Sequence, residues 1–162
     1  MTEKNYGALD YAVMGARTLM KKFTPALLPP AGLFHYHQGV FLSGTEKTYL
    51  HTGLSDLADY IKAWVDGIIT PDGVITNYVK ERFDDLQPGI LLFRLYKETG
   101  DQRYKKAIET IYSHMRVWPK NKAGGFFHKF EHPNQMWLDG LYMAGPFLTM
   151  YGAEKGNAEC FD

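Results

Sequence analysis

Apolar residues recur at helical spacing in six stretches of the chain, and these stretches are of two alternating kinds. Residues 55–69 place Leu57, Ile61 and Trp64 on one face, which is typical of a helix that packs one side against a core. Residues 88–100 are apolar nearly all round, which predicts a helix buried on every side. The one-faced stretches are residues 6–23, 55–69 and 101–118, and the mostly apolar ones are residues 37–53, 88–100 and 135–151.

Strict alternation of the two kinds predicts an all-α fold in two concentric layers, with the one-faced helices outside and the apolar helices inside. Gly53 and Gly100 end two of the apolar stretches, and Ser55 and Asp101 open the stretches that follow. This order is expected for short turns between helices. Two segments fit short extended pieces between helices, namely residues 73–79 and 124–130.

The chain also repeats itself. One constant offset relates two sets of residues, Tyr49, Thr52, Gly53 and Ile61 in the first and Tyr96, Thr99, Gly100 and Ile108 in the second. A third copy is visible in residues 151–161, after an insertion at residues 120–135. A repeat of this length indicates stacked helical hairpins in a solenoid or a closed ring, and insertions on one rim of such folds carry functional groups.

Composition narrows the class of protein. The 18 basic and 18 acidic residues balance, so no net charge recruits nucleic acid or an anionic membrane. The apolar runs are far shorter than the ~20 residues that span a bilayer, and residues 1–20 lack the pattern of a secretory signal. The single cysteine, Cys160, excludes an internal disulfide and fits a reducing compartment. Together these features predict a globular cytoplasmic protein without nucleic-acid or membrane partners.

Three acidic residues at the beginnings of apolar stretches are the first candidates for chemistry. Asp84 and Asp85 precede the second apolar stretch, and Asp139 lies within an aromatic and apolar run at the start of the third. If the apolar helices line a ring, their N-terminal ends face one opening, and these carboxylates meet there. For Asp84 and Asp85, helix capping is an equal alternative, because Asp ahead of a helix commonly accepts backbone N–H bonds. For Asp139, an apolar setting would keep the carboxyl protonated, as a general acid requires.

Histidines and aromatic residues give weaker signals. His35 and His37 are two apart, a spacing that can chelate a metal from a strand, but no carboxylate or cysteine stands beside them at ligand spacing. We therefore expect no metal and no cofactor. His128 lies in the insertion, which favours a hydrogen-bonding role at the rim. The aromatic residues at loop–helix junctions form either a stacking platform or part of the core: Phe34, Tyr36, Phe126, Phe127 and Trp137.

Several segments resemble the unsaturated glucuronyl and rhamnogalacturonyl hydrolases, glycoside hydrolase families 88 and 105. The similar segments are FHYHQGVFLSG, DDLQPGILLFRLYKETGDQRYKKAI, and GGFFHK followed by PNQMWLDGLYMAGPF. The version here is more similar to family 105. Members adopt an (α/α)6 barrel of six hairpins. The resemblance therefore implies that residues 1–162 form about three hairpins, the N-terminal half of a single barrel domain with no internal domain boundary.

The resemblance also implies an activity. These enzymes hydrate the 4,5 double bond of an unsaturated uronic acid at the non-reducing end of pectin-derived (rhamnogalacturonan) disaccharides, which releases the neighbouring sugar. Matched by motif, Asp139 is the general acid/base and Asp84 is the second acid. The matched substrate-contacting positions are Tyr36, His128, Gln135 and Trp137.

Members of these families are much longer than this chain. The inner helices of a half-ring would meet water unless another chain covers them. One expected arrangement is a homodimer that closes the ring around an unsaturated uronyl disaccharide. The alternative is a catalytically inactive helical-hairpin fragment that acts as a binding module. A shared, closed cavity favours the enzyme, and a monomer with an open face favours the module.

Overall fold

The computed structural model describes residues 5–161 and contains six α-helices. Their bounds are α1 Ala8–Lys22, α2 Tyr36–Thr52, α3 Ser55–Ile68, α4 Ile90–Thr99, α5 Gln102–Met115 and α6 Gly140–Lys155. Three 3-10 helices lie between or after them, η1 Pro25–Leu27, η2 Phe83–Gly89 and η3 Ala158–Phe161. All six predicted helices are confirmed, and residues 5–161 contain no assigned strand. The two expected extended pieces are reduced to isolated bridges, Ile69 with Ile75 and Lys120 with Phe126.

The turns that end the inner helices share one backbone conformation. Gly53, Gly100 and Gly156 follow α2, α4 and α6 with φ of 69°, 69° and 64°, a left-handed conformation that glycine adopts without a steric penalty. Asp101 then caps α5, since its carboxylate accepts the backbone N–H of Arg103 at 2.9 Å. Ser55 opens α3 as expected, since it is the first residue of that helix, but no side chain caps α3.

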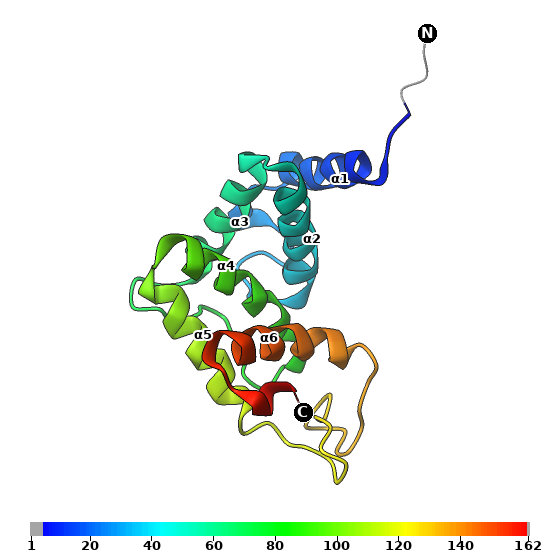
Figure 1. The fold of residues 1–162 in the computed structure, drawn as a ribbon, viewed down its shortest axis with the longest axis vertical. Helices are drawn as coiled ribbons and strands as arrows, with labels where there is room; N and C mark the ends of the chain where they lie inside the picture. Colours follow the sequence, from blue (N-terminus) through cyan, green and yellow to red (C-terminus); the bar gives the residue numbers. More distant parts are fainter. Residues whose placement is uncertain (1–4, 162) are drawn as a thin grey trace.

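The helices are arranged in two rows, as the alternating pattern predicts. Within each hairpin α2 packs against α3 and α4 packs against α5, while α4 also contacts both α2 and α6. The inner row is therefore α2, α4 and α6, and Figure 1 shows the hairpins following one another along the long axis of the molecule. The long loop between α5 and α6 projects at the end of the molecule opposite α1 (Figure 1).

The short helix η2 lies at the centre of this packing. It contacts α2, α4, α5 and α6. A Cβ atom on Gly89 would lie 2.8 Å from both Ile111 Cδ1 and Phe147 Cδ2, so the glycine permits η2 to sit directly against α5 and α6. Since η2 carries Asp84 and Asp85, this packing fixes both carboxyl groups at the start of the inner helix α4.

The prediction of burial on every side is confirmed for α4 and is wrong for α6. In α4 the residues Ile90, Leu91, Leu92, Phe93 and Leu95 are all buried. In α6 Met143, Phe147 and Tyr151 are buried against the core, but Leu141 is 65% exposed. One face of α6 therefore has no covering element within residues 5–161. None of the described helices is long and apolar enough to cross a membrane.

Candidate active site

The first part of the candidate site is the pair of carboxyl groups on η2. Asp85 is buried and Asp84 is half-buried. Burial raises the pKa of Asp84 above its usual range, against the opposing influence of His128, and the Asp139 charge adds to the rise. Burial also raises the pKa of Asp85, to about 7. No side chain caps η2, so the capping alternative does not account for these two residues.

The second part is His128, which the insertion between α5 and α6 carries into contact with η2. Its imidazole is only 3% exposed. The ring stacks on Trp137 with centroids 4.0 Å apart and planes at 7°, and the Phe83 ring meets it edge-on. The backbone N–H of His128 donates to the Gln135 carbonyl at 2.9 Å. Two aromatic rings and a backbone bond therefore hold the imidazole in one orientation.

The third part is Asp139, the residue before α6. Ligand atoms of Asp84, His128 and Asp139 all lie within 4.8 Å of one another, and His128 Nδ1 is 3.8 Å from Asp84 Oδ1. The structure thus brings together the two acids and the histidine that the resemblance singled out. The expectation that Asp139 is buried among apolar neighbours is wrong for this chain, because Asp139 is exposed and the adjacent Leu138 is 84% exposed. Asp139 makes no capping hydrogen bond to α6.

Two atoms of this cluster stand out because they are buried without a hydrogen-bond partner among the described residues. They are Asp84 Oδ1 and His128 Nδ1. Buried polar atoms in folded proteins are nearly always paired, and each exception calls for a ligand, a solvent molecule or a functional reason. The unpaired atoms face each other at 3.8 Å, so they mark the position where a substrate group or an ion would bind.

Trp137 and Gln135 extend the site along the insertion. Trp137 lies between His128 and Lys129, whose ammonium is 5.3 Å from the indole centroid. The indole N–H donates to Gln135 Oε1 at 3.4 Å, and both side chains are exposed. Sequence reasoning did not include Lys129, although it directly follows His128. A flat aromatic surface with an adjacent ammonium is suited to a sugar ring that carries a carboxylate.

Tyr36 reaches the site only through its backbone. Its ring stacks on His37 with centroids 4.1 Å apart, and its backbone N–H lowers the pKa of the Asp85 carboxyl against the larger effect of burial. Within residues 5–161, no recorded contact joins the Tyr36 ring to Asp84, His128 or Asp139. Phe34, the other aromatic residue of this segment, is buried in the core against Trp64 and is not part of a stacking platform.

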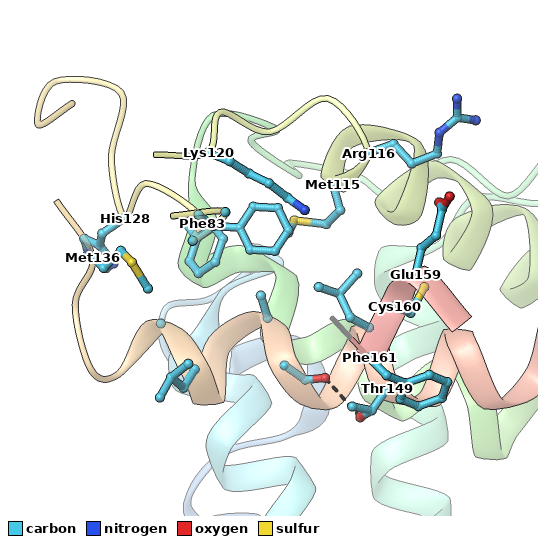
Figure 2. A pocket seen from close by; sticks show the side chains of 18 of the residues that line it. Phe83, Met115, Arg116, Lys120, His128, Met136, Thr149, Glu159, Cys160 and Phe161 are labelled. Atoms are coloured by element: carbon cyan, nitrogen blue, oxygen red, sulfur yellow. Dashed lines mark hydrogen bonds between the residues drawn. The ribbon is translucent and has the colours of Figure 1, made fainter. Parts of the chain in front are cut away.

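A groove of about 670 Å³ begins beside the cluster and runs along α6 to η3. Figure 2 shows His128 and Met136 near one end of it and Glu159 and Phe161 near the other. His128 and Trp137 line the groove, whereas Asp84 and Asp139 do not. The cluster therefore lies at the rim next to the groove and not at its centre.

Chemically, the cluster can transfer a proton. An exposed carboxylate, a half-buried carboxyl whose pKa is raised and a buried imidazole stand within 4.8 Å of one another. Burial and the neighbouring Asp139 charge raise the pKa of Asp84, and a carboxyl group with a raised pKa is suited to general acid–base catalysis. The same donor set, two carboxylates and one imidazole, can also coordinate a divalent metal ion.

Comparison with known proteins matches residues 11–162 to Glycosyl Hydrolase Family 88. A solved structure, that of a glycoside hydrolase from family 105 of C. acetobutylicum ATCC 824, is similar to this chain, with a TM-score of 0.81 and 33% sequence identity. The similarity covers 94% of this chain and 42% of that one, so this chain spans less than half the length of the relative. Its helices correspond to part of an (α/α)6 barrel, and the chain belongs to glycosyl hydrolase family 88.

Proposed function

We propose that this chain carries the acid–base part of an active site that hydrates the 4,5 double bond of an unsaturated uronic acid. The substrate would be a disaccharide from a pectin-type (rhamnogalacturonan) polymer. The observation that carries the proposal is the convergence of Asp84, His128 and Asp139 within 4.8 Å at the beginnings of two inner helices. Family membership supports a glycosidase, and the motifs around these residues favour this substrate class.

The reaction needs few groups from the protein. The double bond is part of a vinyl ether, so protonation at C4 produces a cation at C5 that the ring oxygen stabilises. Water then attacks C5 and gives up a proton, and the resulting hemiketal collapses to release the neighbouring sugar. In this proposal Asp139 donates the proton and then, as a carboxylate, accepts one from the attacking water. Asp84 stands beside it, and the Asp139 charge adds to the rise in the pKa of Asp84 that burial causes.

Other side chains of the site would position the sugar. His128 lies deep in the site with an unpaired Nδ1, where it can bond a hydroxyl or carboxylate oxygen of the substrate. Trp137 offers the exposed part of its indole for contact with the sugar, and Gln135 offers an amide beside it. Tyr36 stands at the N-terminus of α2. Further contacts to the substrate would come from the part of the barrel that this chain does not span.

A second candidate function is a helical-hairpin module that binds another protein without catalysis. The exposed apolar residues Leu138 and Leu141 favour it, because surfaces of this kind mark association sites. A homodimer that covers the open faces of the inner helices would instead support the enzyme. Light scattering on the 162-residue chain distinguishes a monomer from a dimer.

The test is the loss of ultraviolet absorbance when a rhamnogalacturonan-lyase disaccharide is added to the chain. We expect turnover that falls about 100-fold or more in Asp139→Asn, in line with the usual contribution of general acid–base catalysis. Asp59→Asn on the outer helix α3 is the matched control and should retain the wild-type rate. Wild-type turnover in Asp139→Asn would remove Asp139 from this role. A folded wild-type dimer without turnover would contradict the proposed reaction for this chain.

A further inference from the structure

The unpaired atoms of the site indicate a second kind of ligand. His128 Nδ1 and Asp84 Oδ1 are both buried, lack a partner among the described residues, and face each other at 3.8 Å. At 3.8 Å these two atoms are too far apart to form a hydrogen bond with each other. Asp139 offers a third donor atom within 4.8 Å of the other two. Three donors from three separate segments thus converge on one point.

The type of donor selects a class of ion. Imidazole nitrogen combined with carboxylate oxygen suits zinc and its neighbours cobalt, nickel and copper, whereas calcium and magnesium prefer sites made of oxygen alone. The donor atoms of a tetrahedral zinc site lie about 3.4 Å apart, given metal–ligand distances of about 2.1 Å. His128 Nδ1 and Asp84 Oδ1 are 3.8 Å apart, and the ligand atoms of the three residues lie within 4.8 Å of one another. Binding would therefore require the exposed Asp139 side chain to move closer to the other two.

The surroundings hold the nitrogen donor in place before any ion arrives. Stacking on Trp137 and the edge contact from Phe83 fix the plane of the His128 ring, and the bond from its backbone N–H to Gln135 fixes the loop. An imidazole that is already oriented loses little side-chain freedom when it binds a metal. The open side at Asp139 leaves coordination positions for water.

We propose that Asp84, His128 and Asp139 form a binding site for one divalent ion of the zinc class. The ion would occupy the carboxylates that the proposed hydration reaction uses for proton transfer. Zinc would therefore inhibit that reaction in competition with the substrate. The site itself does not depend on the proposed reaction, because all three donors belong to the described part of this chain.

The test measures metal binding without turnover. Zinc chloride is titrated into the metal-free chain by calorimetry, and cobalt chloride is titrated while the visible absorption of the cobalt and the tryptophan fluorescence are recorded. We expect one ion per chain and quenching of Trp137, which stacks on His128. His128→Gln should weaken zinc binding at least tenfold, and His37→Gln, on the neighbouring histidine pair, should leave it within twofold.

Asp139→Asn provides a second variant whose folding is secure, because the side chain is exposed and makes no capping bond. It should also weaken zinc binding at least tenfold, and circular dichroism checks that both variants are folded. Equal zinc affinity in the wild type and in both site variants would overturn the proposal, as would the absence of binding at millimolar zinc. If the chain binds zinc but does not hydrolyse the disaccharide, only the proposed function is contradicted. The metal-site proposal and the proposed function are therefore tested separately.

Discussion

Helices α4 and α6 are similar in sequence and differ in surroundings. Both are apolar nearly all round, both lie in the inner row, and both end in a left-handed glycine. α4 lies between α2 and α6 with α5 behind it, and its apolar residues are buried. α6 has a neighbour of the inner row on one side only, and three of its large apolar residues are exposed, namely Leu141, Tyr142 and Met150. An apolar composition thus permits a helix to be buried, but the elements packed around it decide whether it is.

The largest expected effect comes from deleting the same side chain in the two helices. Leu91→Ala in α4 removes a fully buried side chain and should lower the free energy of unfolding by about 2–5 kcal/mol. Leu141→Ala in α6 should change it by about 0.5 kcal/mol or less, because that side chain is mostly exposed. Urea denaturation followed by circular dichroism measures both. Equal losses would show that α6 is covered in solution, for example by a second copy.

A smaller effect is expected from the carboxyl groups that precede α4. Because burial raises the pKa of Asp85 to about 7, the folded chain binds this proton more tightly than the unfolded chain does. The free energy of unfolding therefore falls as the pH rises from about 4 to about 7, by at most about 1.4 kcal/mol per pH unit. Asp85→Asn should remove most of this dependence, and the raised pKa of Asp84 should leave a smaller fall. Denaturation at a series of pH values measures both.

Asp101 serves as a control, because its pKa is shifted in the direction opposite to that of Asp85. The bond to Arg103 lowers the pKa of Asp101, so its stabilising contribution is lost as the pH falls and not as it rises. Asp101→Asn should thus alter the acid side of the stability profile and leave the range between pH 5 and 7 unchanged. An Asp85→Asn profile that falls toward pH 7 as steeply as the wild-type profile would mean that another group causes the slope.

The smallest effect concerns the turns after the two inner helices. Asp101 caps α5, and Asn157 stands at the equivalent place before η3, where its side-chain oxygen accepts the backbone N–H of Glu159 at 3.2 Å. Asp101→Ala should cost about 1 kcal/mol, the usual value for a lost cap. Asn157→Ala should cost less, since η3 is a single short turn. Thermal melts compare the two, and a larger loss in Asn157→Ala would contradict this order.

Much of the fold was predictable because apolar spacing is a local property. The residues that define each face of a helix lie within a few positions of one another, so all six helices could be identified from the sequence. The start of α6 was less predictable. The helix was expected from residue 135 and begins at Gly140, because residues 137–140 form a turn in which Gly140 donates to the Trp137 carbonyl. The covering of α6 depends on other elements, which its own sequence does not describe.

The residues that form the candidate site could be predicted from the sequence, but the surroundings of each side chain could not. Motif resemblance selected Asp84, His128 and Asp139, and the structure places them together. The depth at which each lies follows from tertiary packing, so the exposure of Asp139 and the stacking of His128 on Trp137 could not be read from neighbouring residues. Lys129 was missed for the same reason, since its position over the indole becomes evident only in three dimensions.

The order of the elements along the chain has a consequence for how the protein forms. The pairs α2–α3 and α4–α5 join neighbours across very short turns, and contacts of this local kind form quickly and early during synthesis. The cluster, in contrast, joins η2 to residues 128 and 139, which are made long after it. On the ribosome, the first two hairpins can therefore assemble before the site exists, and its three groups meet only when α6 closes against η2.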